Sequence, residues 1–328
     1  MASALFLACG QTFGGSSGPS ADGGIGGSGI STGPITAFGS IFVNDIEWFI
    51  DDSEIELDDQ VGSEGDLRLG MVVRVEGDIN RENGTGEAVR VFFNDELEGP
   101  IESIGDIGLD GSIKELEVLD QKVWIEVGVT WFDDDEGDDG GDGDDSDFGF
   151  DTIAVGDVIE VSGLIDQNGI IRATHIELEG EVEFGVTEVE LKGTITGFAA
   201  GSSFMIGAVT IHFDPTGVTT DLSGLPDGVQ NDLFVEIEGT ITAAQEVEAS
   251  AIELENEFDD DDDADDILFT GFVQNFMGVD DFFVGSQAVD ASGAEFENGD
   301  ASMLVEGILI EVDGDIVGDV LIADEVEF

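Results

Sequence analysis

The sequence predicts an all-β protein, a tandem array of four small antiparallel β-barrels that follows a flexible N-terminal tether. One pattern occurs four times in the 328 residues, and it opens at Gly33, Gly99, Gly193 and Gly271. Within each copy apolar residues alternate with polar ones, which is typical of half-buried strands, and helical periodicity is nearly absent. A sequence that repeats itself in this way determines the architecture before any function is considered.

Each copy predicts the same elements in the same order. An opening strand leads through a two-residue turn to a second strand, and a variable loop precedes a closing hairpin. The two-residue turns are Asn44-Asp45, Asp120-Gln121, Gly207-Ala208 and Gly285-Ser286. The closing hairpins turn at Asn83-Gly84, Asn168-Gly169 and Asp313-Gly314, residue pairs that readily adopt positive φ. A glycine ends the strand before each hairpin, at Gly77, Gly163, Gly239 and Gly307, and lets that strand bend at a barrel corner.

These features predict closed barrels that are OB-like in size. The chain is 41% hydrophobic, enough to form cores and unlike acidic disordered chains. Because each copy is small, its core is thin and we expect it to lean on its neighbours. The predicted segments are a tether at 10–32, repeat 1 at 33–98, repeat 2 at 99–182 with an acidic loop at 133–147, repeat 3 at 183–257, an acidic linker at 258–266 and repeat 4 at 267–328.

The four copies, roughly residues 33–328, also resemble a known family, and the first two show the likeness most clearly. The first reads GPITAFGSIFVNDIEWF, then LGMVVRVEGDIN and EAVRVFF, and the second contains GDVIEVSGLIDQNGIIRATHIELEG. These segments resemble the bacterial domain of unknown function 5666 family, with the likeness strongest in the first half of the chain. The resemblance implies OB-like β-barrel repeats in cell-envelope proteins that are often lipid-anchored. It implies no activity.

The charge is strongly negative, with 77 acidic residues against 8 basic ones and a net charge of −69. Nucleic acid is excluded as a partner, because binding phosphates requires lysine and arginine. An anionic membrane surface is excluded as an electrostatic partner for the same reason. Such a field attracts cations and basic proteins. Two explanations remain open, namely adaptation to a saline medium that screens the charges, and specific cation binding.

The single cysteine, Cys9, follows the apolar run ALFLA. This segment resembles the lipobox of bacterial lipoproteins, although Phe6 stands where leucine is usual and the run is too short for a full signal peptide. We expect residues 1–9 to be a truncated signal or lipobox-like segment that is lipidated at Cys9, and the Gly/Ser-rich residues after it to be a tether. The expected location is the bacterial cell envelope, in the outer membrane, the periplasm or at the cell surface. The alternative is an incidental apolar N-terminus with a free thiol.

Two acidic runs are candidate cation sites. Dense carboxylates suit Ca²⁺, which takes six to eight oxygen ligands. Neither run has the residue order of an EF-hand, and the alternative is a solvated loop whose charges repel one another. The candidate ligands are Asp133, Asp135, Asp138, Asp142, Asp144, Asp145, Asp147, Asp259, Asp261 and Asp263.

The aromatic and catalytic residue types give few further signals. Trp48 follows the alternation of core residues, whereas Trp124 and Trp131 are candidates for stacking a sugar ring, a ligand that OB-like barrels accept. Alternation places His175 and His212 on solvent-facing positions. No nucleophile motif or phosphate-binding glycine loop is present, so the sequence predicts a protein that is not an enzyme.

The predicted function is therefore a non-enzymatic, lipid-anchored envelope protein. Its repeats would act as a structural or adhesive spacer with an acidic, cation-responsive surface. The alternative is a Ca²⁺-dependent or carbohydrate-binding module centred on repeat 2. Expected partners are cations, basic proteins or envelope polysaccharide, and no cofactor other than Ca²⁺ is indicated.

Overall fold

The computed structural model describes residues 27–58, 60–81, 83–108, 111–134, 148–255, 266–318 and 320–328. In these ranges the regular structure is β-strand apart from one 3-10 turn at Glu64–Asp66. No helix among them is long and apolar enough to cross a bilayer. The prediction of an all-β array of four small barrels is confirmed.

Repeat 1 is a closed barrel of five principal strands. They are β1 (Gly27–Pro34), β2 (Ile41–Val43), β3 (Ile46–Phe49), β6 (Val72–Asn80) and β7 (Thr85–Phe93). β1 pairs with β6, β6 with β7 and β2 with β3, all antiparallel, while β3 and β7 run parallel. A bridge between Ala37 and Phe42 closes the circle from β1 to β2. β4 (Glu54–Leu57) lies parallel to β7, and β5 (Gln60–Val61) pairs with β4.

The other repeats have the same strand order. The strands of repeat 2 are β8 (Leu97–Ile107), β9 (Ile113–Val118), β10 (Gln121–Glu126), β11 (Trp131–Asp134), β12 (Asp157–Ile165) and β13 (Ile171–Glu181). Those of repeat 3 are β14 (Glu188–Thr194), β15 (Ser203–Ile206), β16 (Val209–His212), β17 (Phe234–Ala243) and β18 (Glu246–Leu254). Repeat 4 contains β19 (Asp266–Gly278), β20 (Asp281–Val284), β21 (Gln287–Asp290), β22 (Glu295–Glu297), β23 (Leu309–Val317) and β24 (Val320–Glu327).

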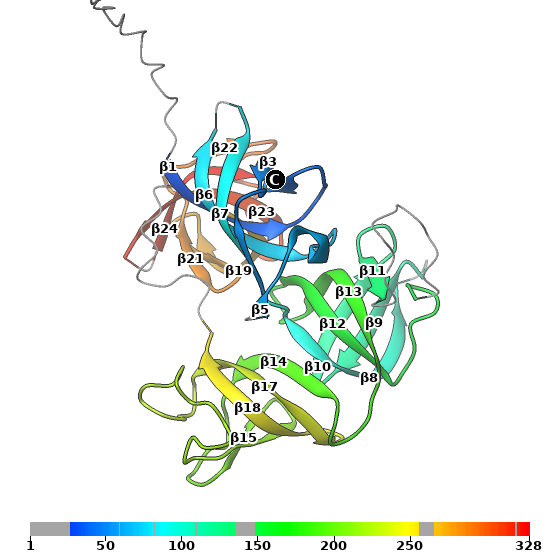
Figure 1. Ribbon diagram of the computed structural model, residues 1–328. Helices are drawn as coiled ribbons and strands as arrows, with labels where there is room; N and C mark the ends of the chain where they lie inside the picture. Colours follow the sequence, from blue (N-terminus) through cyan, green and yellow to red (C-terminus); the bar gives the residue numbers. More distant parts are fainter. Residues whose placement is uncertain are drawn as a thin grey trace, which may run out of the picture.

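Main-chain pairing joins the barrels two by two. β1 pairs in parallel with β19, so repeats 1 and 4 share a 13-stranded sheet. β8 pairs antiparallel with β14, so repeats 2 and 3 share an 11-stranded sheet. The array is therefore not a linear string, because its first and last members lie side by side (Figure 1).

The cores follow this pairing. Repeats 2 and 3 have one continuous core of buried residues. Repeats 1 and 4 have separate cores that exchange one residue each. Leu268 of β19 packs in the core of repeat 1, and Ile30 of β1 packs in the core of repeat 4. Each thin barrel thus gains apolar contacts from its neighbour, as its size requires.

Two segment boundaries differ from the sequence prediction. β1 begins at Gly27, inside the segment 10–32 that was predicted to be a tether, and Asp266 of the predicted linker is the first residue of β19. Glycine and serine form a strand here because β1 lies between two partners, β6 and β19, that pair with its backbone. Residues 10–26 and 256–265 lie outside the described residues.

One glycine occupies the same bulge in each closing hairpin. The strand register shifts at Gly77, Gly163, Gly239 and Gly314. A Cβ atom at Gly77 would lie 2.1 Å from the carbonyl oxygen of Glu87, and one at Gly314 would lie 2.1 Å from that of Ile322. The prediction for repeat 4 was therefore wrong, because its bend glycine is Gly314 and not Gly307. Asp313-Gly314 lies within β23 and is not a turn.

Gly77→Ala should destabilise the protein, because the added methyl group would collide with backbone that cannot move away. We expect a loss of about 2 kcal/mol or more in the free energy of unfolding, measured by urea titration. Gly105→Ala is the matched control, since it is also a strand glycine but a Cβ there meets no atom within 4 Å. Equal stability of the two variants would contradict the bulge as the cause.

Candidate functional site

A row of five glutamates crosses the seam between repeats 2 and 3. Glu160, Glu98 and Glu190 occupy directly opposed positions on β12, β8 and β14. Glu177 on β13 and Glu238 on β17 extend the row at its two ends. Opposed residues in a sheet share a face with their Cβ atoms about 5 Å apart, and like charges in such pairs are destabilising. This glutamate row therefore requires protons or cations to balance it.

Two aspartates of repeat 1 approach the row. Asp58 follows β4, and Asp95 lies in the short connection between β7 and β8 with only 2% of its surface exposed. The amide of Asp95 donates a hydrogen bond to Oδ1 of Asp58 at 3.1 Å. One carboxylate oxygen each from Asp58, Asp95 and Glu190 lie within 4.8 Å of one another. We call these three residues the Asp95 cluster.

The side chain of Asp95 has an unusual environment. Among the described residues, neither of its carboxylate oxygens has a hydrogen-bond partner, and both are inaccessible to solvent. Its backbone carbonyl, in contrast, accepts a hydrogen bond from Nζ of Lys192 at 2.6 Å. Burying a carboxylate without a partner is costly, so a group that binds these oxygens would be strongly favoured.

Lys192 is the basic side chain that acts on this cluster. It extends from β14, is almost fully buried, and its Nζ lies 3.7 Å from Oε1 of Glu236. Burial alone would lower its pKa, but the carboxylates of Glu96, Glu236 and Glu255 outweigh that effect and hold the pKa above its usual range. Lys192 therefore stays charged, and one positive charge faces several negative ones.

The carboxyl groups respond by binding protons more tightly. Burial raises the pKa of Asp95 to about 7, although the charge of Lys192 acts to lower it. Burial, followed by the charges of Asp95 and Glu179, raises the pKa of Glu98 to about 8. Burial and the charge of Asp95 also raise the pKa of Glu190 far above its usual range. A cluster with these shifts holds protons near neutral pH unless a cation replaces them.

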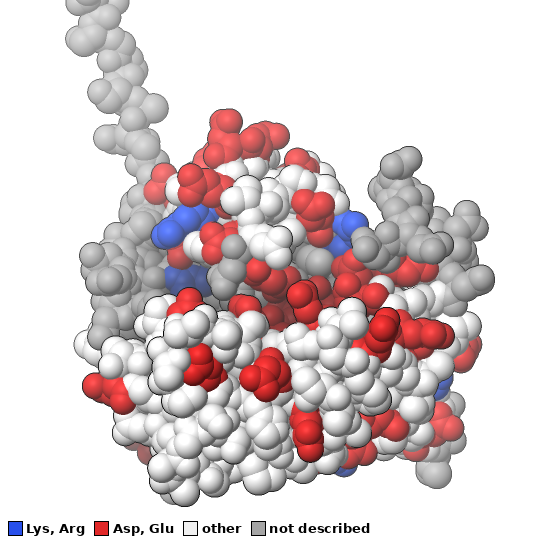
Figure 2. Space-filling model, turned by 60° about the horizontal axis from the view of Figure 1, so that its bottom comes forward, with Lys and Arg blue, Asp and Glu red and all other residues white. Residues whose placement is uncertain are grey.

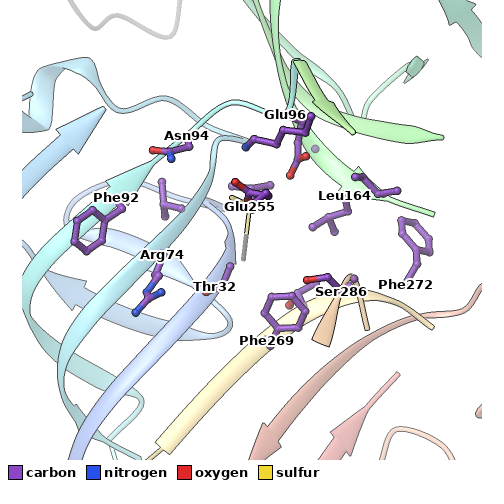
Figure 3. Close-up of a pocket in the computed structure, with 18 of the residues that line it drawn as sticks. Thr32, Arg74, Phe92, Asn94, Glu96, Leu164, Glu255, Phe269, Phe272 and Ser286 are labelled. Carbon is purple, nitrogen blue, oxygen red and sulfur yellow. The ribbon is translucent and has the colours of Figure 1, made fainter. Parts of the chain in front are cut away.

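A cavity of about 770 Å³ lies beside the cluster, where all four repeats meet. Glu96, Glu255 and the basic Lys192 form its charged side, and Phe92, Phe269 and Phe272 contribute aromatic walls from repeats 1 and 4. Figure 3 shows Glu96 and Glu255 near each other, across the cavity from Phe269 and Ser286. On the face of the molecule drawn in Figure 2, acidic side chains gather across the middle, where the surface is hollowed.

The predicted cation ligands are mostly outside the described residues. Asp133 is the exception, and it forms an ion pair with Nε of Arg68 at 2.5 Å that links repeat 2 to repeat 1. The predicted site residues for which no placement is described are Cys9, Asp135, Asp138, Asp142, Asp144, Asp145, Asp147, Asp259, Asp261 and Asp263.

The three tryptophans have different environments. Trp48 is fully buried, as predicted. Trp131 opens β11 and is 53% exposed. Trp124 donates its indole N–H to Oε2 of Glu115 at 2.9 Å, and the guanidinium of Arg172 lies 4.7 Å from its ring centroid. One face of the Trp124 ring is thus already covered, while Trp131 has a surface on which a ligand could stack.

The predicted solvent position of His175 was wrong. Only 2% of its surface is exposed, and its Nδ1 lies 3.0 Å from the carbonyl oxygen of Leu69 in repeat 1. Burial lowers its pKa to about 4. Alternation correctly placed this side chain outside its own barrel, but repeat 1 covers that outer face. The histidine therefore helps to form the interface between repeats 1 and 2.

The fold and the comparison with known families agree. Four closed five-stranded barrels of one topology, joined by shared sheets, define a tandem array of OB-like β-domains. The family described as "Domain of unknown function (DUF5666)" matches residues 32–91, 98–177 and 192–253, which correspond to repeats 1, 2 and 3. The matches cover more than half of the chain, so the protein belongs to this family. A search of curated proteins found no match to the chain.

Without divalent cations, raising the pH from 5 to 8 should destabilise the protein. The pKa of Glu98 is about 8 in the folded state against an ordinary value of 4.5, so its stabilising proton is lost as the pH rises through this window. Glu98→Gln should reduce the fall in melting temperature by roughly 3 °C, measured by scanning calorimetry in EDTA. Glu246→Gln, at an exposed position of β18, should behave like the wild type, and an equal effect of both variants would contradict this explanation.

Lys192→Met should destabilise the protein at pH 8 by about 3 kcal/mol, because it leaves buried carboxylates without their cation. The control is Lys122→Met, which removes an exposed lysine that pairs with Glu115 at 2.9 Å and should cost less than about 1 kcal/mol. Urea titration of both variants gives the comparison. Losses of similar size would show that Lys192 does not balance the seam.

Proposed function

We propose that the protein is a non-enzymatic structural component of the bacterial cell envelope, anchored by lipid at Cys9, whose repeats respond to cations. The observation that carries the proposal is the position of the shifted carboxyl groups. They lie where repeats meet, at the glutamate row and the Asp95 cluster. Neutralising charge at these seams therefore acts on how the barrels hold together.

The cation response has a direct physical basis. With no counter-charge, the opposed glutamates of β8, β12 and β14 repel one another across the main-chain pairs that join repeats 2 and 3. Cations from the medium reduce that repulsion and therefore stabilise the pairing between repeats 2 and 3. A saline environment gives the same effect through screening. Cations, basic proteins and envelope polysaccharide remain the proposed partners.

The entry of the chain into the fold supports an anchored, load-bearing role. β1 is the first described strand and includes the C-terminal part of the predicted tether, and it pairs with β6 on one side and β19 on the other. A pull on the tether would therefore act on two barrels at once. Strands held on both sides resist separation better than a terminal strand at a sheet edge. This arrangement suits a structural or adhesive protein held at its N-terminus.

Cys9→Ser should release the protein from the membrane fraction of its native host, because it removes the thiol that would carry the lipid. Cell fractionation followed by immunoblotting measures the change, with Phe6→Leu as the control that should remain in the membrane fraction. Mass spectrometry of the native protein should show a lipid-modified Cys9 at the mature N-terminus. An unmodified Met1 on that protein would overturn the anchor.

A further inference from the structure

We propose that the Asp95 cluster binds a divalent cation, preferably Ca²⁺, between repeats 1 and 3. The site deepens the proposed cation response and rests on it, but it makes a more specific claim. Screening by salt acts on all exposed charges, whereas this site holds one ion between Asp58, Asp95 and Glu190.

The spacing of the three carboxylates fits one ion. Three oxygens that all lie within 4.8 Å of one another can surround a single centre at about 2.8 Å or less. Ca²⁺ binds oxygen at about 2.3–2.6 Å in flexible geometry, so a small inward movement completes the contacts. Mg²⁺ requires about 2.0–2.1 Å and near-ideal octahedral geometry, which this wider spacing suits less well. The remaining ligands of the ion would be water from the neighbouring cavity.

The burial of Asp95 points to a ligand independently of the acidic cluster itself. Its side chain is aimed at two other carboxylates, and its two oxygens have no hydrogen-bond partner among the described residues. Lys192, the neighbouring cation, donates to the backbone carbonyl of Asp95 instead. A folded protein rarely leaves such atoms unsatisfied, and a bound cation satisfies both the charge and the lone pairs.

The origin of the ligands gives the site a mechanical role. Asp58 follows β4 and Asp95 follows β7, both in repeat 1, whereas Glu190 lies on β14 of repeat 3. The strands of these two repeats do not pair with each other among the described residues. An ion held by all three carboxylates would therefore join two barrels that main-chain pairing leaves separate. Removing it would loosen the junction while each barrel stays folded.

A melting experiment on the purified full chain tests the site. Ca²⁺ should raise the melting temperature more than NaCl of equal ionic strength, by about 5 °C at a concentration about one hundred times the dissociation constant. Ions that condense loosely on acidic loops bind folded and unfolded chains alike, so they add little to this excess. Mg²⁺ should give a smaller excess.

The variant Asp95→Asn makes the test specific, because its two effects have opposite signs. In EDTA it should melt at a higher temperature than the wild type, since one repelling charge is gone. Ca²⁺ should no longer raise its melting temperature more than NaCl of equal ionic strength does. Glu190→Gln should melt like the wild type in EDTA, because burial already keeps Glu190 protonated there, but it should also lose the additional rise in melting temperature that Ca²⁺ gives. It serves if Asp95→Asn does not fold. Glu311→Gln is the matched control: burial raises the pKa of Glu311 to about 7 at the separate seam of repeats 1 and 4. It should also melt higher in EDTA but keep the full Ca²⁺ excess.

The possible outcomes separate the two proposals. An equal effect of Ca²⁺ and NaCl on the wild type would overturn the site and leave a general cation response. No effect of either salt would overturn both. An undiminished Ca²⁺ excess in Asp95→Asn and Glu190→Gln would place the bound ion elsewhere and overturn the site.

Discussion

The direct pairing of strands from different repeats is the constraint on which the structure depends. A small barrel buries too little apolar surface to be stable alone, and sharing a sheet with a neighbour extends its core. The same pairing fixes the register of outward-facing residues on both barrels. Where β8 meets β14, that register sets Glu98 directly beside Glu190. The strand pairing that stabilises the array therefore also places like charges, those of Glu98 and Glu190, next to each other.

The repulsion between acidic side chains is balanced differently at the two seams. At the seam of repeats 1 and 4, Arg81 reaches Asp313 and lies 3.3 Å from Asp266, so arginine from one barrel pairs with acids of the other. At the junction of repeats 1, 2 and 3, buried Lys192 faces more carboxylates than Arg81 does at the other seam. Raised carboxyl pKa values and unpartnered Asp95 oxygens follow from that imbalance. Among the described residues, this junction is therefore strongly dependent on its ionic surroundings.

The sequence predicted the parts of the fold that are local to one repeat. Alternation located the core, including Trp48, and the predicted turns at Asn44-Asp45, Gly207-Ala208 and Gly285-Ser286 are confirmed. The predicted turn Asp120-Gln121 is off by one residue, since Gln121 opens β10 and the turn is Leu119-Asp120. It could not predict which barrel faces pair, because the period-two pattern describes only the inside and outside of a single barrel. His175 was misplaced for that reason, and Gly314 was missed because repeat 4 has two glycines, Gly307 and Gly314, that each follow an apolar run. The Asp95 cluster combines residues from two repeats, so no motif within a single copy predicts it.

Hydrogen exchange followed by mass spectrometry tests the central claim, that the seam of repeats 1, 2 and 3 is held against charge repulsion by cations. It should be measured at pH 8 in Ca²⁺ and in EDTA at equal ionic strength. We expect Ca²⁺ to slow amide exchange selectively in β8, β14 and the connection that contains Asp95, with little change in β20 and β21 of repeat 4. Slowing that is uniform across the repeats, or absent from the seam, would contradict the account.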